Sequence, residues 1–388
     1  MKIVYLGAFP PDFLIKRSAG KIDSLYRAYQ SLIRGLKENN DNELIVITSP
    51  EIASWPGGPL FIRREHNERE GLTMVSSLNL PIAKQFWTIL SMFFEVSRSI
   101  RHAKNKVIVI IPFLVFRHVF TLRLLHWLFP KKVIQACVVP DIFFPQKKIN
   151  KYVNKFTEYL ASGFDAYLLY TKKMAEHLHL KEGCYEVIEG YRELLERRPK
   201  PSKVFCVVYA GSLNLNYGVG RLVEAMQFVK DQDVQLHLYG AGSAVKLIEE
   251  TSKRDKRIVF HGKVPNSIAV DAIYSASVLV NPRNAKDGKY TEYSFPSKDI
   301  EYMATGTPTL LCKLPGMPTE YYGHFVDLGS GTPKEIASAI MKVKAMTPHE
   351  RGIIGEDSKN FIKERMNYKK QGEKIVKLFC SIINNKSI

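Results

Sequence analysis

The strongest constraint on the fold is an alternation of short β-branched runs with longer amphipathic segments. In the first half of the chain, KIVYL, ELIVIT and KVIVII alternate with helical patterns over residues 22–38 and 83–102. Strand-like runs joined by helical crossovers predict a parallel sheet with helices on both faces. Three further runs, VIQACVV, DAYLLYT and YEVIEG, continue the rhythm to about residue 190. The first half therefore predicts one doubly wound α/β domain.

A polar segment, YRELLERRPKPS, separates this half from a second series of the same kind. After it come KVFCVVYAG, QLHLYGAG, RIVFHG, SVLVNP, TPTLLC and HFVDLG, each followed by a helical pattern. A chain of 388 residues also exceeds what one hydrophobic core usually serves. We predict an N-terminal domain over residues 1–195, a C-terminal domain over residues 203–360, and terminal helices over residues 361–388 that can pack back on the N-terminal domain.

The composition is that of a globular protein in a reducing compartment. Hydrophobic residues make up 45% and charged residues 24% of the chain, close to the averages for soluble domains. The five cysteines are scattered, and no CxxC pair or Cys/His cluster has metal-ligand spacing. The most apolar region, residues 107–129, is interrupted by charged residues, and the N-terminus lacks a signal-peptide cleavage site. We expect a cytoplasmic protein without a metal site, either soluble or peripheral at the inner face of the cell membrane.

The net charge of +18 is shared by both halves, with +11 in residues 1–200 and +7 thereafter. Such an excess favours anionic partners: phosphorylated substrates, anionic lipid headgroups or nucleic acid. A solvated basic surface without a specific partner is the other interpretation. Because no zinc finger, RNA-binding aromatic motif or basic-region helix is present, a nucleic-acid-binding role rests on charge alone, and we expect no nucleic-acid partner.

Ligands of open parallel sheets bind beyond the carboxyl ends of the strands. In the second half, three strand-to-helix junctions are candidates: YAGSLNLNYGVG, YGAGS, and the long segment that begins with NPRNAKDG. Gly211 and Gly240 there allow the backbone to approach a phosphate closely. Val245 replaces the third glycine of a dinucleotide fingerprint, and Gly20 lacks the remainder of a P-loop, which argues against both of those nucleotide sites.

The third junction continues as YSFPSKDIEYMATGTP. Pro296 suits the first helical turn and leaves the backbone N–H groups of Ser297 and Lys298 unpaired, as an anion-binding position requires. Lys298 adds positive charge, and Glu301 shares its helix face and can accept hydrogen bonds from hydroxyl groups. A diphosphate with an attached ribose suits this arrangement. A plain helix cap with a surface Lys/Glu pair is the alternative.

The segment YSFPSKDIEYMATGTPTLL resembles the FPSK…EYMA region of GT-B glycosyltransferases of the family 4 type, which include many bacterial polysaccharide-assembly enzymes. AGSLNLNYGVGRLVEAM, LHLYGAG, VFHGKVP and YSASVLVNPR resemble, in order, successive blocks of that family's nucleotide-binding domain. The resemblance covers about residues 204–328. It implies two Rossmann-like doubly wound domains that face a central cleft, with the N-terminal domain on the acceptor side.

The resemblance also implies a retaining transfer of a hexosyl or related group from a nucleotide-diphosphate sugar to a saccharide or lipid-linked acceptor. No metal and no further cofactor is implied. Ser297 and Lys298 would hold the diphosphate, and Glu301 the ribose hydroxyls. Asn281 and Arg283 would lie on the loop that faces the donor sugar.

Two positions depart from the family pattern. The first glutamate of the family's glutamate pair falls on Tyr293, with Glu292 one residue earlier, and the usual Arg and Lys of the first loop appear as Ser212 and Tyr217. We therefore expect Lys298 to be the main phosphate cation, and we keep Glu292 as a catalytic candidate. A transferase that binds its donor without turnover stays open, as does a sugar-nucleotide epimerase or phosphorylase, although neither of these two explains the FPSK…EYMA block as well.

In the N-terminal domain the candidate residues follow the first strand, at Ser18, Ala19 and Gly20, and the run VIQACVV, at Asp141. In the family, a residue near Asp141 lies beside the transferred sugar, but an aspartate there can also cap a helix. A basic N-terminal domain could dock on anionic headgroups. The mixed apolar and basic segments 83–102 and 113–129 fit that idea, although such stripes more often face a core. The patterns name no donor base, sugar or acceptor.

Overall fold

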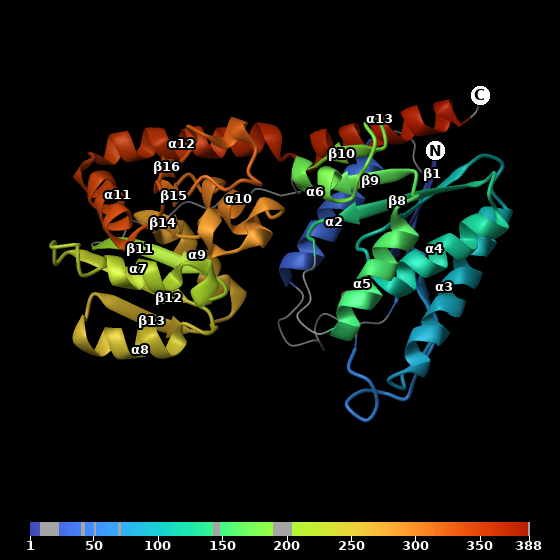
Figure 1. Cartoon of the computed structure of the whole chain (residues 1–388), viewed down its shortest axis with the longest axis horizontal. Coiled ribbons are helices and arrows are strands. Elements are labelled where there is room, and N and C mark those ends of the chain that lie inside the picture. Colours follow the sequence, from blue (N-terminus) through green and yellow to red (C-terminus); the bar gives the residue numbers. More distant parts are fainter. Residues whose placement is uncertain are drawn as a thin grey trace. The chain divides into compact units, whose positions relative to one another are not determined.

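The computed structural model describes residues 1–7, 23–39, 43–49, 52–68, 71–142, 148–188 and 204–386. The chain divides into two compact units, which are described separately below (Figure 1). Unit 1 comprises Met1–Arg192 and Tyr368–Ile388, and unit 2 comprises Glu193–Asn367. Among the terminal helices, α12 (Pro348–Arg365) therefore belongs to unit 2 and α13 (Tyr368–Asn385) to unit 1.

Unit 1 is built on an eight-stranded sheet of order β10-β9-β8-β7-β1-β2-β5-β4. Neighbouring strands are parallel except β4, which runs antiparallel to β5. The six predicted apolar runs all form strands of this sheet. Sequence patterns did not predict β3 to β6, because these strands have only two or three residues each. The strands of this sheet are β1 (Lys2–Gly7), β2 (Glu43–Thr48), β4 (Glu65–Asn67), β5 (Leu72–Met74), β7 (Val107–Ile111), β8 (Val133–Val139), β9 (Ala166–Leu169) and β10 (Tyr185–Val187). Strands β3 (Phe61–Ile62) and β6 (Ser77–Leu78) pair antiparallel in a separate two-stranded sheet.

Helices cover both faces of this sheet, as a doubly wound fold requires (Figure 1). On one face, α2 (Asp23–Glu38) and α13 pack with Ile108, Ile134 and Leu168 of the central strands. On the other face lie α3 (Ala83–Arg101), α4 (Phe116–Leu128) and α5 (Lys148–Ala161), with α4 in contact with both of its neighbours. A shorter helix, α6 (Lys172–His177), follows β9.

Unit 2 contains a six-stranded, fully parallel sheet of order β13-β12-β11-β14-β15-β16. Helices α7, α8 and α11 pack on one face, and α9 and α10 on the other, where α12 packs against α10. The strands are β11 (Phe205–Ala210), β12 (Val234–Tyr239), β13 (Ile258–Gly262), β14 (Val278–Asn281), β15 (Thr309–Leu311) and β16 (Val326–Asp327). The helices are η1 (Leu215–Tyr217), α7 (Val219–Ala225), α8 (Val245–Arg254), α9 (Asn266–Ser275), η2 (Ala285–Asp287), η3 (Lys289–Glu292), α10 (Ser297–Met303), η4 (Thr319–Tyr321) and α11 (Pro333–Ala345).

The starts of α11 and α12 are closed by reciprocal side-chain bonds. Thr332 accepts a hydrogen bond from the backbone N–H of Glu335, and the Glu335 carboxylate accepts one from the backbone N–H of Thr332 at 2.9 Å. Hydrogen bonds to the carboxylate from the Thr332 hydroxyl and from the Thr332 backbone N–H lower the pKa of Glu335 to about 2. Thr347 and Glu350 form the same capping box at α12. The sequence pattern Thr-Pro-x-Glu, which occurs at both places, predicts a capping box with proline in the first helical turn, and the structure confirms both helix starts.

The predicted fold class, two Rossmann-like doubly wound α/β domains, is likewise confirmed. All five cysteines are free thiols. No helix among the described residues is both long and apolar enough to cross a bilayer.

Candidate functional site

The candidate site of unit 2 lies where three neighbouring strands end. Gly211 follows β11, Gly240 follows β12, and Asn281 is the last residue of β14. Because β12, β11 and β14 are adjacent and parallel, their carboxyl ends meet at one edge of the sheet. The loops after these strands therefore lie together at the edge where ligands of such sheets bind.

The first two loops approach each other so closely that only glycine fits. Gly240 has φ +137°, and a Cβ built there would lie 1.8 Å from the carbonyl oxygen of Gly211. Gly211 has φ +141°, and its Cβ would lie 2.5 Å from the amine nitrogen of Lys298. Both positions also have a backbone conformation that side chains disfavour. The two glycines therefore bring the backbone and the Lys298 amine together.

Lys298 is the second residue of α10, and its amine rests on an aromatic ring. The amine nitrogen lies 3.5 Å from the centroid of the Tyr209 ring, a cation–π contact. Burial, followed by the positive charge of Arg283, lowers the pKa of Lys298 to about 7, although Asp299 and Glu301 oppose this shift. An anion that binds beside the amine would favour its charged form. The amine is thus placed to take up a proton when an anionic ligand arrives.

Asn281 and Asp299 tie the end of β14 to the first turn of α10. The side-chain amide of Asn281 donates to Oδ1 of Asp299 at 2.5 Å, and both side chains are buried. Burial raises the pKa of Asp299 to about 6. Asn281 therefore holds α10 in place, and its expected position facing a donor sugar stays a prediction.

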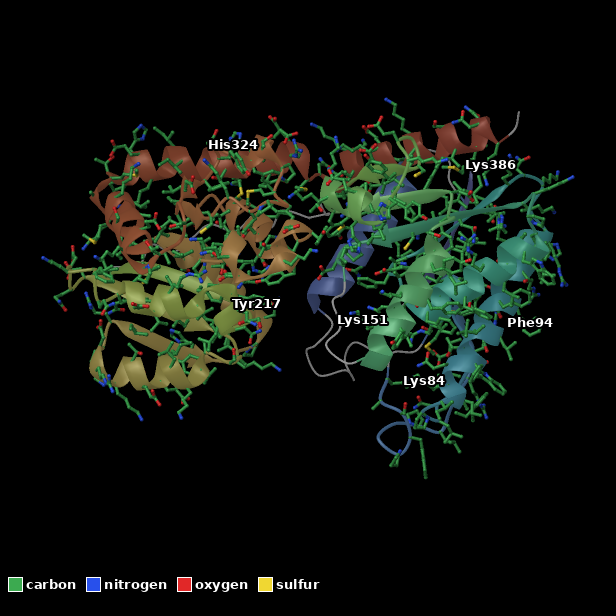
Figure 2. All side chains as sticks on the ribbon, viewed as in Figure 1. Lys84, Phe94, Lys151, Tyr217, His324 and Lys386 are labelled. Carbon is green, nitrogen blue, oxygen red and sulfur yellow. The ribbon has the colours of Figure 1, made fainter. Side chains whose placement is uncertain are left out.

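Arg283 follows β14 and lies against two tyrosine rings. Its guanidinium carbon is 4.1 Å from the centroid of the Tyr217 ring and 5.4 Å from that of Tyr290. Figure 2 marks Tyr217 on unit 2. The Nε atom of Arg283 is buried without a hydrogen-bond partner among the described residues. The ring of Tyr217 thus supports a neighbouring cation.

The loop between β14 and α10 is anchored by contacts that sequence reasoning did not single out. Arg221 of α7 donates two hydrogen bonds to the Asp287 carboxylate, at 2.7 and 2.8 Å, and one to the carbonyl of Pro282 at 2.9 Å. The Tyr290 hydroxyl donates to the carbonyl of Asn216 in the first loop at 2.8 Å. The spacing of Asn284 and Asp287, which form a capping box, was the available sequence signal. Arg283 is therefore carried by a firmly held loop.

The remaining candidates of unit 2 lie in the loops after β11 and β14 and in the first turns of α10. Ser297 is exposed as the first residue of α10, and Glu301 is partly buried one turn later. Ser212 is exposed, and its hydroxyl accepts a hydrogen bond from the Asn214 amide at 2.8 Å. Glu292 closes η3, and Tyr293 follows it.

One expectation about α10 needs correction. Pro296 was expected inside the first helical turn, but it is the N-cap residue, with ψ +119°. The helix begins at Ser297 because an extended Pro296 precedes it, and the carbonyl of Pro296 accepts a bond from the N–H of Asp299. Ser297 and Lys298 are still the first two helical residues.

The unit 1 candidates are less defined by geometry. Asp141 is exposed just after β8, and its Oδ1 lies 2.9 Å from the backbone nitrogen of Ile142. Helix α5 begins at Lys148, and a helix-capping role for Asp141 stays an alternative. Ser18, Ala19 and Gly20 lie outside the described residues. Within the described chain, no group of three or more His, Cys, Asp or Glu side chains could hold a metal ion.

Comparisons with known proteins bear on the fold and on the family of unit 2. A family model described as glycosyl transferases group 1 matches residues 205–345. HepE from Anabaena in complex with UDP is similar in structure, with TM-score 0.68 and 16% identity over 98% of this chain and 100% of that chain. Sucrose-phosphate synthase from Thermosynechococcus elongatus matches with TM-score 0.69 and 15% identity over 99% and 100%.

An E. coli trehalose-6-phosphate structure bound with UDP-2-fluoro glucose matches with TM-score 0.66 and 10% identity, over 100% of this chain and 99% of that chain. No curated protein matches the chain significantly by sequence. At these identities the structural likeness establishes the fold, which is GT-B.

Proposed function

We propose that this chain, which has the GT-B fold and matches the group 1 glycosyl transferase model over residues 205–345, is a glycosyltransferase that moves a sugar from a UDP-sugar to a saccharide or lipid-linked acceptor. The observation that carries the proposal is the pair of cations, Lys298 and Arg283, beside the glycine loop at Gly211. UDP as the nucleotide is supported by the UDP complex of HepE and the UDP-2-fluoro glucose complex of the E. coli protein.

In this proposal the donor diphosphate binds at the start of α10. The Lys298 amine and the backbone N–H of Ser297 face its oxygens, and Gly211 lets the backbone approach them. During transfer the bond between the anomeric carbon and the diphosphate oxygen breaks, so negative charge grows on the departing UDP. Fixed positive charge stabilises that developing charge most effectively where water is partly excluded. Two side-chain cations can do this without a metal ion, so we propose a metal-independent reaction.

The rest of the donor site follows from the same placement. Glu301, one turn after Ser297, accepts hydrogen bonds from the ribose hydroxyls. Arg283 points its guanidinium toward the donor sugar from the loop that Asn281 and Arg221 hold. Gly240, Ser212 and Tyr293 complete the donor pocket. The acceptor hydroxyl then bonds to the anomeric carbon with retention of configuration, which the family resemblance supports.

Five residues remain as candidates around the transferred sugar. Asp141, together with Ser18, Ala19 and Gly20, is proposed to line the acceptor side of the transferred sugar, with Glu292 as a second carboxylate in unit 2. We place the protein in the cytoplasm, because five free thiols suit a reducing compartment. We place it in polysaccharide assembly because of the family resemblance.

The deciding experiment is a thermal-shift and calorimetric panel of UDP, GDP, ADP and their common sugars, with EDTA present. We expect saturable stabilisation by UDP and by one UDP-sugar, and its loss in Glu301→Ala. A matched control is Glu320→Ala, on η4 of the same unit, which should bind as wild type does. Failure of every nucleotide to bind would refute the transferase proposal, and binding only with added Mg²⁺ would refute its metal independence.

One difference from the family's sequence pattern supports a second candidate function. Tyr293 stands where the family has the first glutamate of its pair, so a protein that binds the donor without transferring it is the alternative. Incubation of the bound UDP-sugar with saccharide and lipid-linked acceptors separates the two. Release of UDP that depends on the acceptor supports transfer, whereas tight binding without release supports the alternative.

A further inference from the structure

Unit 1 exposes an unusual number of aromatic side chains. All three tryptophans of the protein, Trp55, Trp87 and Trp127, are exposed, and Trp127 is 75% accessible. Among the described residues, ten of the eleven exposed aromatic side chains lie between positions 55 and 159 of unit 1, and the remaining one is Phe228 of unit 2. Contiguous exposed apolar surface on a globular protein marks an interaction site.

Helix α3 is apolar on two sides. Ile89, Met92 and Val96 are buried toward the rest of unit 1. Phe86 and Phe94, which are 66% and 65% exposed, lie eight residues apart, with the exposed Leu90 between them at steps of four. Residues four apart share one face of a helix. A solvent-facing side is normally polar, so this stripe is not explained by the fold of unit 1.

Helices α4 and α5 extend the aromatic surface. The Phe116 ring of α4 lies 5.5 Å from that of Phe120 and 6.1 Å from that of Phe156 on α5, measured between centroids. On α5, Tyr152 and Tyr159 are 72% and 73% exposed. Because α4 contacts both α3 and α5, the three helices form one layer. Its outer side is called the aromatic face below.

The aromatic face is also strongly basic. Helices α3, α4 and α5 together contain eight Lys or Arg and two Asp or Glu. Exposed cations stand on α3, at Arg98 and Arg101, and on α5, at Lys151 and Lys155. Glu95, the one acidic residue of α3, is paired with Arg64 at 2.5 Å. Figure 2 marks Phe94 on α3 and Lys151 on α5.

We propose that the aromatic face of α3, α4 and α5 docks on an anionic lipid bilayer. Trp, Tyr and Phe side chains partition into the interfacial region of a membrane, and Lys and Arg are attracted to anionic headgroups. A second copy of the chain fits less well, because two such faces would repel each other. Docking would bring the protein to an acceptor held in the membrane, and that consequence rests on the proposed function.

Cosedimentation of the full chain with vesicles tests the docking. The vesicles contain either phosphatidylcholine alone or phosphatidylcholine with about 30% phosphatidylglycerol, an anionic lipid. We expect binding to the anionic vesicles at about 0.1 M salt and its loss at about 0.5 M salt, because salt screens attraction to the headgroups. Equal binding to both vesicle types, or no binding at low salt, would overturn the proposal.

Two double variants locate the surface. Phe86→Ser with Phe94→Ser removes aromatic area, and Lys151→Glu with Lys155→Glu reverses charge. Each pair should weaken vesicle binding about tenfold or more. The lysine pair acts through charge, since each basic residue near the surface contributes roughly a fivefold factor. The phenylalanine pair acts through the apolar area that would be buried in the membrane. Matched controls in unit 2 are Phe228→Ser and the pair Lys246→Glu with Lys253→Glu, all at exposed positions.

The controls should bind vesicles as wild type does. Equal losses in the unit 2 controls, or wild-type binding by both unit 1 variants, would contradict the assigned face. Sedimentation velocity without lipid tests whether a second copy of the chain occupies the face. A dimer that dissociates in the Phe86/Phe94 variant would assign the face to a second copy instead. UDP thermal shifts without vesicles should be unchanged in every variant. A docking failure is thereby separated from a failure of donor binding.

Discussion

The two units use aromatic side chains in opposite ways. In unit 2, the rings of Tyr209 and Tyr217 lie against the cations Lys298 and Arg283 beside tightly packed loops. In unit 1, rings such as Phe94 point to solvent from the outside of a helical layer. The first arrangement suits a small anionic ligand, which needs a few charges at fixed positions. The second suits an extended partner, whose binding depends more on contact area and overall charge than on the exact position of each side chain.

This difference also explains where a family pattern can be seen. The family model matches only residues 205–345, inside unit 2. At Gly240 any side chain would meet the backbone carbonyl of Gly211, so the loop geometry constrains the sequence there. An aromatic surface has no comparable requirement, because many residues at many positions provide the same area.

The largest expected effect concerns the glycine loops of unit 2. Gly240→Ala should lower the free energy of unfolding by about 3 kcal/mol, because its Cβ meets the Gly211 carbonyl at 1.8 Å and φ is positive. The control is Gly352→Ala in α12, where no atom lies within 4 Å of the new Cβ. That change should stabilise by up to about 1 kcal/mol. Urea unfolding measures both, and similar effects at both positions would contradict the close packing of the loops.

The next effect concerns the cation of the donor site. Lys298→Ala should reduce kcat/KM about 100-fold, because a charge-assisted contact to the diphosphate is lost. Steady-state kinetics with UDP release as the readout measure this. Lys313→Ala is the control, since that exposed amine pairs with Asp327 at 2.9 Å. Near wild-type turnover and donor affinity in Lys298→Ala would remove Lys298 from the proposed site.

A smaller effect should appear as a pH dependence of donor affinity. With the pKa of Lys298 lowered to about 7, the free protein loses this positive charge as pH rises above 7. A bound diphosphate favours the protonated amine, so binding takes up a proton and weakens with rising pH. We expect affinity for the UDP-sugar to fall about tenfold between about pH 7 and 8.5.

Calorimetry in buffers of different ionisation enthalpy detects the proton uptake directly. Lys298→Arg is the informative variant, because arginine stays charged throughout this range and should flatten the pH profile. An equally steep profile in Lys298→Arg would assign the titration to another group.

The smallest expected effect is on the stability of unit 1 when an exposed ring of its aromatic face is removed. Phe94→Ser should change the free energy of unfolding by less than about 0.5 kcal/mol, because the ring is 65% exposed. Met92→Ala, two residues earlier and fully buried, should cost about 2–5 kcal/mol. If Phe94→Ser destabilised as strongly as Met92→Ala, the aromatic face would be part of the core of unit 1 rather than a surface for a partner.

Much of the fold followed from local patterns in the sequence. The run VIQACVV coincides with β8, and the helical pattern of residues 83–102 differs from α3 by one residue at its end. Strand runs and capping boxes are short-range signals, because backbone hydrogen bonding and side-chain periodicity are set within a few residues. The sequence did not predict the hairpin-like strands β3 to β6, because they are too short to show an alternation of apolar and polar residues.

The sequence by itself thus determined the two α/β domains, the order of their elements, and Ser297, Lys298 and Glu301 as candidates for a diphosphate and ribose. Only the tertiary structure decided that Tyr209 lies beneath Lys298, since these residues are far apart along the chain. The tertiary structure also decided which apolar side of α3 is buried and which is exposed. Periodicity cannot tell which of two apolar sides faces a core, and folding buried Met92 while leaving Phe94 exposed, because a helix on a sheet can bury only one side.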